Sequence, residues 1–235
     1  MDGAILACTD PSVPGGSAAD WAASEARLHG LPLRVTAGSP PDAGRAKMIV
    51  YDISRDMPTT GSPLGPGPLV AAEAMGRPLV FVPDRHTSTY RAGQIVLGVD
   101  ARDPGGPAVE FAFDEARVRK ARLHAVHAWT LPPEAREWPF GPPEQDRASW
   151  EDHEVQLLAD ALRPWREKFP EVPVLEDVTL LTPARALLHH SATATLLVVG
   201  RRPAAGRDGV VRAIVGEALC PVAVVTGSDA AGRPR

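Results

Sequence analysis

The chain has 235 residues, of which 44% are hydrophobic and 23% are charged, and this composition excludes a disordered protein and a coiled coil. The length allows one large domain or two small ones. A net charge of −4 argues against nucleic-acid binding, which usually needs a basic surface, and two cysteines are too few for a disulfide framework. No apolar run reaches the roughly 18 residues of a membrane span, and the first residues lack the pattern of a secretory signal. We therefore expect a soluble, cytoplasmic protein that binds neither membranes nor nucleic acid.

An internal repeat organises the chain, because two segments align in the same order without a gap. The aligned residues are Asp10 with Asp100, Gly15-Gly16 with Gly105-Gly106, Ala22 with Ala112, and Glu25-Ala26-Arg27 with Glu115-Ala116-Arg117. Self-similarity of this kind indicates a duplicated structural unit. We interpret the chain as a tandem duplication, with a shortened first copy over residues 1–92 and a complete second copy over residues 93–235.

Each copy opens with the pattern of a strand, a helix and a second strand. Residues 5–9 and 95–99 are short runs that are apolar on both faces, as buried parallel strands are. A Pro-Gly-Gly loop follows in each copy, and after it come apolar residues at helical spacing: Ala18, Trp21, Ala22 and Ala26 in the first, and Ala108, Phe111, Ala112 and Ala116 in the second. Second strands are predicted over residues 31–36 and 122–128, with right-handed crossovers.

The second copy is longer in its middle than the first. A Pro-rich loop over residues 131–143 precedes a helix predicted over residues 148–169, which starts near Ser149 with Asp152 as a capping-box variant. Its apolar positions are Val155, Leu158, Leu162 and Trp165, and Pro164 is expected to kink it or to begin a new turn. A strand over 174–180, a helix over 183–192 and a strand over 195–199 follow. The first copy has instead a loop rich in Pro and Gly over residues 57–68.

The second copy resembles a universal stress protein domain from end to end. The residues that carry this resemblance are Gly98-Val99-Asp100, Glu115-Ala116-Arg117, Val126-His127-Ala128-Trp129, Pro164-Trp165-Arg166-Glu167-Lys168, Leu197-Val198-Val199-Gly200 and Cys220-Pro221-Val222-Ala223-Val224-Val225. The resemblance implies two Rossmann-like (adenine-nucleotide-hydrolase-like) α/β domains with mainly parallel sheets, the first of them truncated. It also implies a ligand cleft at the carboxyl ends of the strands, where the strand order reverses.

The nucleotide signature of that family is a phosphate loop, written Gly, two residues, Gly, nine residues, and Gly-Ser or Gly-Thr. Glycines let backbone N–H groups approach phosphates, and the last pair opens a helix whose N-terminus favours anions. Here Gly200-Arg201-Arg202 fits the first part, but Pro203, which has no N–H, stands at the second Gly. Asp208-Gly209 stands at the Gly-Ser position, and the Asp208 carboxylate would repel a phosphate. Four arginines could still hold an anion: Arg201, Arg202, Arg207 and Arg212.

The resemblance therefore implies candidate nucleotide-binding residues only in the second copy, with ATP and Mg²⁺ as the candidate ligands. These residues are Asp100, Ala101, Ala128, Gly200, Arg201, Arg202, Asp208 and Gly209. For Asp100 a second interpretation is open, since Asp is a favoured first residue of a turn and a Pro-Gly-Gly turn follows it. In the first copy, residues 51–56 contain no glycine after their strand, so nucleotide binding is not expected there.

The histidines do not predict a metal site. His124 and His127 are three residues apart on a strand, so they point to opposite faces and cannot share an ion. His189 and His190 diverge on a helix, and no cysteine or carboxylate partner is evident for them. The tryptophans are interpreted as core and loop anchors.

The function predicted from these observations is a universal stress protein-type regulator, an adenine-nucleotide sensor with a degraded phosphate loop. The alternative is a nucleotide-free scaffold that binds an unknown protein partner or another small ligand. A weak ATP hydrolase is a distant third, because no nucleophile, base and acid can be assembled. The apolar last strands, residues 79–82 and 222–225, would be exposed at sheet edges. We expect them to pair antiparallel and to join the copies into an intramolecular pseudo-dimer, and a homodimer is a further expectation.

Overall fold

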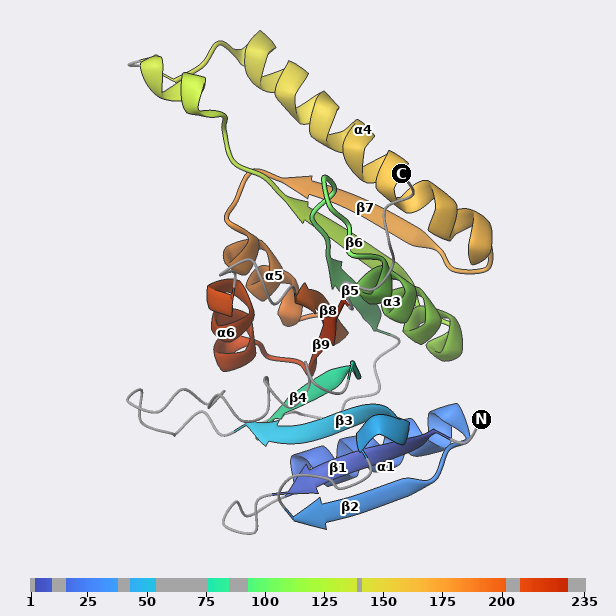
Figure 1. Ribbon diagram of the computed structural model, residues 1–235. Helices are drawn as coiled ribbons and strands as arrows, with labels where there is room; N and C mark the ends of the chain where they lie inside the picture. The colour runs from blue at the N-terminus through green and yellow to red at the C-terminus, as the bar shows by residue number, and fades with distance from the viewer. Residues whose placement is uncertain are drawn as a thin grey trace, which may run out of the picture.

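A single mixed sheet runs through the whole molecule in the computed structural model (Figure 1). The structure describes residues 3–9, 16–37, 43–53, 76–84, 93–138, 141–201 and 208–227. Within these residues nine strands form the sheet, in the order β2-β1-β3-β4-β9-β8-β5-β6-β7. The predicted loop over residues 57–68, the loop residues 202–207 and Asp10 lie outside the described residues.

The first half of the chain contributes four of the described strands. Its elements are β1 (Ala4–Thr9), α1 (Ser17–His29), β2 (Leu33–Ala37), the short 3₁₀ helix η1 (Ala43–Arg45), β3 (Ala46–Ile53) and β4 (Leu79–Pro83). The second half contributes the other five strands and most of the helices. Its elements are β5 (Gln94–Gly98), α3 (Gly106–Arg119), β6 (Leu123–Ala128), the 3₁₀ helix η2 (Pro133–Glu137), α4 (Glu144–Lys168), β7 (Val174–Thr179), α5 (Pro183–Ser191), β8 (Ala194–Arg201), α6 (Asp208–Glu217) and β9 (Val222–Thr226).

Every pair of neighbouring strands in this sheet is parallel except β4 and β9, which join the two halves. Val80 of β4 faces Ala223 of β9 in an antiparallel ladder, with Leu79 facing Val224 and Phe81 facing Val222. The predicted antiparallel pairing of the two last strands is therefore confirmed. Each strand covers the backbone edge that the other would leave exposed.

The two halves share local details beyond their strand order. Both β1–β3 and β5–β8 contain a register shift directly after their first residue pair, Ala4 with Ala46 and Gln94 with Ala194. Helices α1 and α3 each follow a left-handed glycine, and each ends at a left-handed residue, Gly30 and Lys120. Such matched irregularities are what a duplicated unit predicts, and the division at residue 92 stays a prediction.

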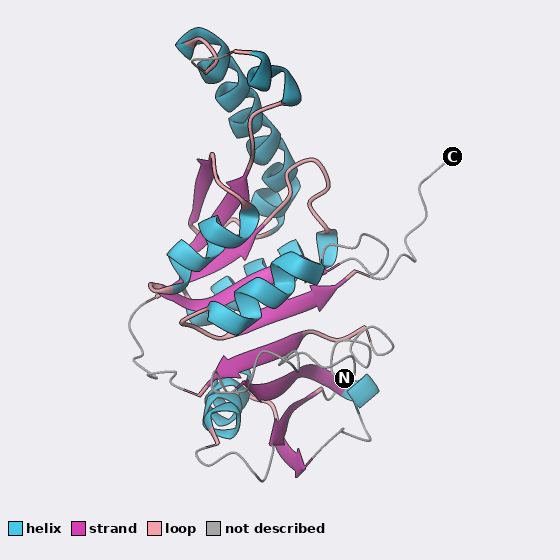
Figure 2. Cartoon of the chain, turned by 90° about the vertical axis from the view of Figure 1, so that its left-hand side faces the viewer, coloured by secondary structure: helices cyan, strands magenta, loops and turns pink. Residues whose placement is uncertain are grey.

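Helices α1, α3 and α4 pack on one face of the sheet, and α5 and α6 pack on the other (Figure 2). All eight alanine and aromatic positions predicted for the inner faces of α1 and α3 are buried. The alanines among these positions let the two helices lie close to the strands, because alanine fills little of the space between layers.

Helix α4 differs from its prediction. It begins at Glu144 after Pro143 and not near Ser149, so the capping-box assignment is wrong. The acidic residues Glu144 and Asp146 occupy its first turn, where the helix dipole favours them. Val155 is 46% exposed, so its predicted place on the inner face of the helix is wrong, and the buried positions Glu154, Leu158 and Leu162 follow one another at a spacing of four residues. The helix continues through Pro164 to Lys168.

A buried ionic network connects α1 of the first half with α3 of the second. The Arg119 guanidinium lies 2.5 Å from Glu25 Oε2 and also donates to the Glu115 carboxylate. His29 Nε2 lies 3.2 Å from Glu115 Oε2. Burial raises the pKa of Glu25 despite the nearby arginine, whereas at Glu115 the hydrogen bond from His29 and the charge of Arg119 outweigh burial and lower the pKa. One guanidinium therefore contacts two buried carboxyl groups, one from each half, and His29 lies beside both of them as well.

Replacement of that arginine should destabilise the whole protein. Arg119→Met keeps most of the side-chain volume but leaves Glu25 and Glu115 without their cation, which should cost about 3–5 kcal/mol of unfolding free energy. The loss should shrink as the pH falls, because protonation then neutralises the two carboxylates. Chemical denaturation at several pH values measures both effects.

Arg117→Met is the matched control, since Arg117 pairs with Asp114 at the surface of the same helix. It should change the unfolding free energy by no more than about 0.5 kcal/mol. Equal losses for the two variants would contradict the assigned role of the buried network.

Removal of the first half should expose the edge of β9. A fragment of residues 93–235 should dimerise or aggregate at concentrations where the full chain does not, because the unpaired N–H and C=O groups of β9 then seek another strand. Light scattering and sedimentation measure the assembly. A monomeric fragment with the stability of the intact chain would show that the β4–β9 ladder is dispensable.

Candidate functional site

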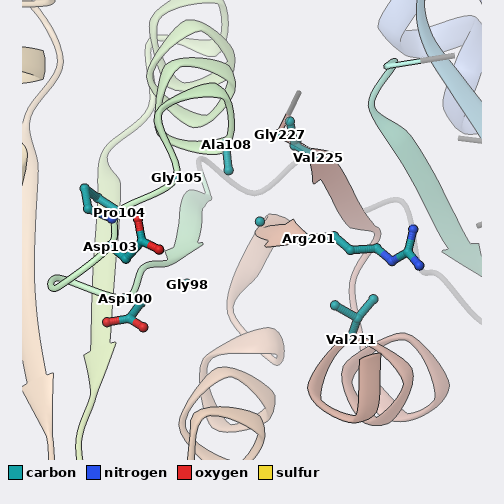
Figure 3. A pocket seen from close by; sticks show the side chains of 11 residues that line it. Gly98, Asp100, Asp103, Pro104, Gly105, Ala108, Arg201, Val211, Val225 and Gly227 are labelled. Carbon is teal, nitrogen blue, oxygen red and sulfur yellow. The ribbon is translucent and has the colours of Figure 1, made fainter. Parts of the chain in front are cut away.

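A small cavity lies at the carboxyl ends of β5 and β8, where the strand order reverses. The chain leaves β5 through α3 to β6 on one side, whereas β8 lies on the other side of β5. Such a switch point is the usual ligand position in open α/β sheets. The cavity has a volume of about 110 Å³, and Gly98, Asp100, Gly105, Gly200 and Arg201 are among its lining residues (Figure 3).

Three of the predicted nucleotide-binding residues meet in this cavity: Asp100, Gly200 and Arg201. Ala101 and Ala128 do not line it. Ala101 is buried beside it, and its backbone N–H donates to His127 Nδ1 over 3.3 Å. Ala128 is half-buried at the end of β6.

The remaining predicted residues belong to the phosphate-loop segment. Asp208 and Gly209 open α6, as the alignment with the family signature predicts, and Gly216 lies near the end of this helix. Arg202 and the side chain of Asp208 lie outside the described residues. The structure therefore shows where α6 begins, and the loop residues 202–207 before it lie outside the described residues.

Asp100 forms the predicted turn and also lies at the cavity, and its role in nucleotide binding stays a prediction. Its backbone C=O accepts from the Asp103 N–H over 2.9 Å, and its Oδ1 accepts from the Arg102 N–H over 3.2 Å. These bonds define an Asx-type turn over residues 100–103. The same residue lines the cavity together with Asp103. The turn thus presents two carboxylates to the cavity.

The N-terminus of α3 faces the cavity without a side-chain cap. Gly105 precedes the helix in the left-handed region, at φ 61°, and no acidic residue occupies the first turn. Gly200 of β8 lies against this turn, since a Cβ added to it would be 3.4 Å from the Ala108 Cβ. Pro107 in the first turn has no N–H, and the Ala108 N–H donates to the Gly105 C=O over 3.0 Å. The helix dipole and the Gly106 N–H are therefore what favour an anion at this end of α3.

The corresponding position of the first half is closed by a carboxylate. Cys8 faces Tyr51 in the β1–β3 ladder, as Gly98 faces Val199 in the β5–β8 ladder, so Asp52 of β3 stands where β8 has Gly200. Asp52 Oδ1 accepts a hydrogen bond of 2.6 Å from the Ala18 N–H, in the first turn of α1. The first half therefore supplies its own anion at this helix end. Sequence reasoning missed Asp52, although the missing glycine after this strand was its signal.

A second cavity of about 560 Å³ lies on the other side of the 100–103 turn, between η2 and α4. Arg102, Trp129, Trp150 and Glu154 line it. Arg102 donates to Glu154, whose carboxylate also lies 3.0 Å from His127 Nε2. Burial acts to raise the pKa of Glu154, but hydrogen bonds from Arg102 and His127 outweigh it and lower the pKa. Trp129 is almost fully buried, as expected of an anchor.

The histidines on β6 point to opposite faces of the sheet, as predicted. His127 contacts Glu154 of α4, whereas His124 contacts Asp177 of β7. The expectation that His190 has no carboxylate partner is wrong, because its Nε2 lies 3.3 Å from Asp177 Oδ2. The partner comes from a neighbouring strand and not from the helix, so helical spacing could not reveal it.

Comparison with known proteins identifies the class to which this fold and cleft belong. The model of the universal stress protein family matches residues 92–226, and the chain belongs to this family. Universal stress protein Rv2623 of Mycobacterium tuberculosis H37Rv is 32% identical over 171 residues, which cover 69% of this chain and 56% of the relative. Universal stress protein Rv1996 of the same strain is 35% identical over 143 residues, covering 55% and 43%. The chain thus spans about half the length of these curated relatives.

Solved structures support the fold. A universal stress protein from Archaeoglobus fulgidus DSM 4304 matches 96% of this chain and 88% of its own, with a TM-score of 0.56 and 14% identity. The functionally unknown protein PA1789 from Pseudomonas aeruginosa PAO1 matches 96% and 82%, with a TM-score of 0.50 and 18% identity. The Rossmann-like α/β fold is therefore established. In the described part of the chain, no helix combines the length and the apolar character that crossing a membrane requires.

The carboxylate cap of α1 can be tested by its effect on stability. Asp52→Ala should lower the unfolding free energy by about 1–2 kcal/mol, the upper part of the range for a lost N-terminal cap, because the acceptor is charged and half-buried. Asp20→Ala is the control, since Asp20 lies exposed in the same first turn and acts only through the helix dipole. Denaturant titration compares the two variants. A loss for Asp52→Ala no larger than for Asp20→Ala would contradict the cap.

Proposed function

We propose that this universal stress protein is a regulatory protein whose second half binds an adenine nucleotide weakly, with its phosphates at the N-terminus of α3. The observation that carries the proposal is the contrast between the halves. Gly200 leaves the α3 terminus open to an anion, whereas Asp52 fills the equivalent place at α1. The first half then serves as the permanent structural partner of the second, and an additional homodimer stays a prediction.

The shape of the site supports a divided binding mode. A cavity of about 110 Å³ has room for a phosphate group but not for a whole nucleotide. The cavity of about 560 Å³ beyond the 100–103 turn is large enough for a nucleoside. A nucleotide lying across this turn would pass Asp100 and Ala101, two of the residues that the family resemblance marks as candidates for nucleotide binding.

The charges at the site support binding of modest strength. The Arg201 guanidinium points away from Asp100 and Asp103 (Figure 3), so backbone N–H groups would hold the phosphate in place of this arginine. The carboxylates of Asp100 and Asp103 are ligands of the type that Mg²⁺ prefers, and the ion would offset their repulsion of the phosphates. Pro203 and Asp208 of the phosphate loop remove a donor and add a negative charge.

A binding role fits this cavity better than a catalytic one. The described residues that line it include no histidine or lysine beside the two carboxylates. A general base paired with a positioned nucleophile is therefore not evident among them. If the following measurements detect no nucleotide binding, they favour the alternative function, a nucleotide-free scaffold.

The first measurement is the affinity for Mg²⁺–ATP of the full chain at near-physiological salt. We expect a dissociation constant weaker than micromolar. Gly200→Asp gives the second half the carboxylate that Asp52 supplies in the first, and it should weaken binding by about tenfold or more through repulsion and occupation of the α3 N–H groups. Asp208→Ser should tighten binding by removing a charge near the phosphates. Calorimetry with Mg²⁺–ATP as titrant measures all three proteins.

Gly44→Asp is the matched control, because it adds the same charge in open space on the first half and should leave the affinity unchanged. Mass spectrometry of ligand released from freshly purified protein tests occupancy directly. A dissociation constant at or below micromolar would refute the weak-binding proposal, and no binding at millimolar ATP would favour the scaffold. Weaker binding by Asp208→Ser would show that Asp208 holds Mg²⁺ in a functional loop.

A further inference from the structure

Two histidines and an aspartate converge on the face of the sheet that α5 covers. His124 Nε2 lies 3.0 Å from Asp177 Oδ2, and His190 Nε2 lies 3.3 Å from the same oxygen. The two imidazole rings meet edge to face, with centroids 4.5 Å apart. All three donor atoms lie within 4.8 Å of one another. Each histidine therefore presents the same ring nitrogen toward one point.

The fold explains why residues distant in sequence meet here. Strands β6 and β7 pair in parallel, with His124 opposite Leu175 and Asp177 opposite Val126, so His124 and Asp177 project from the same face. Helix α5 crosses this face and brings His190 from its last turn. Three separate elements thus each supply one side chain.

The spacing of the donors matches that of a tetrahedral zinc site. With metal–ligand bonds of about 2.0–2.2 Å, neighbouring ligand atoms of a tetrahedron lie about 3.3 Å apart. The two distances to Asp177 Oδ2 are close to this value. Two imidazoles favour zinc and its transition-metal neighbours over Mg²⁺ or Ca²⁺, which prefer oxygen ligands.

One side of the cluster is open to solvent. The side chain of His124 is only 6% exposed, but those of His190 and Asp177 are 18% and 32% exposed. An ion can therefore reach the donors, and water can complete its coordination. The buried Nδ1 of His124 has no hydrogen-bond partner in the described part of the chain.

The charge of the cluster also suits a cation. Burial lowers the pKa of His190, and the neighbouring His124 and His189 lower it further, against the opposing effect of Asp177. This direction favours the neutral imidazole of His190, which is the form that binds metal. The ion pairs that Asp177 makes within the described residues are both with histidines.

Two other clusters of similar composition already contain a cation. Glu25, His29 and Glu115 have comparable spacing, but the Arg119 guanidinium lies between their carboxylates. His127 and Glu154 are likewise joined by Arg102. The carboxylates of both clusters thus already pair with an arginine, whereas no arginine or lysine pairs with Asp177 in the described structure.

We propose that His124, Asp177 and His190 form a binding site for one divalent transition-metal ion of the zinc class, with water completing the coordination. The site lies apart from the proposed nucleotide cleft. His124 lies near the amino end of β6, whereas the cleft lies at the carboxyl ends of the strands.

The test is a titration of metal-stripped, tag-free full-length protein with ZnCl₂, followed by competition with a fluorescent zinc indicator. The expected result is one ion per chain. Asp177→Asn and His190→Ala should each weaken binding on the order of a hundredfold, because loss of a direct ligand costs at least as much as the 10–100-fold that loss of a supporting contact costs. His189→Ala is the matched control on the same helix and should change the affinity by less than about twofold.

Two further readouts do not depend on affinity alone. Co²⁺ in place of Zn²⁺ should give visible absorption bands of a four-coordinate site in the native protein and in His189→Ala, but not in Asp177→Asn. Zinc should also raise the melting temperature of the native protein and not that of His190→Ala, since only binding to the folded state stabilises it. Circular dichroism establishes that each variant folds, and Asp177→Asn, which keeps the side-chain shape, replaces His190→Ala if that variant does not fold.

Absence of zinc binding by the folded native protein up to about 100 μM, an affinity weaker than about −5.5 kcal/mol, would overturn the proposal. Binding that survives both Asp177→Asn and His190→Ala would overturn it as well, because the ion would then be held elsewhere. Either result would leave the three residues as a hydrogen-bonded cluster.

Discussion

Strands β4 and β9 each present a row of backbone N–H and C=O groups that must be covered, and each strand covers the other. Both strands are apolar and buried, so neither could remain at a sheet edge without exposing hydrophobic surface as well. This one antiparallel ladder sets the two halves side by side. It brings α1 against α3, and there Arg119 meets carboxylates from both helices. The contacts of Arg119 with Glu25 and of His29 with Glu115 depend on the ladder, because each of them joins the two halves.

The same frame produces two different helix termini. In the first half Asp52 reaches the N–H of Ala18, and in the second half the equivalent Gly200 leaves the end of α3 open. A carboxylate and a phosphate compete for the same N–H groups, so one residue at this position decides between a closed and an open terminus. The asymmetry lets one half keep a structural task while the other keeps a cavity.

The parts of the fold that follow local rules could be predicted from the sequence. The burial of Ala18, Trp21, Ala22 and Ala26 follows from their helical spacing. The pairing of β4 with β9 follows from the need to cover apolar strand edges. The start of α4 could not be located, because Pro143 and the acidic first turn compete with Ser149 as a helix beginning. Contacts such as Asp52 with Ala18, or His190 with Asp177, depend on which strands become neighbours. Strand order and register decide these contacts, and no short-range pattern contains either.

Helix α5 is in contact with both proposed sites. Its last turn carries His190 at the metal cluster. One turn earlier Leu187 packs so closely on Gly98, which lines the small cavity, that a Cβ on Gly98 would lie 2.6 Å from Leu187 Cδ1. Ala186, Leu187 and Ser191 of α5 are buried, so the strands beneath would respond to a displacement of this side of the helix. An ion that draws His190 toward Asp177 would therefore act on α5, the same helix that packs against Gly98 of the small cavity. The coupling free energy between the two sites would be reciprocal, so that a metal that changes nucleotide affinity is itself bound differently when the nucleotide is present.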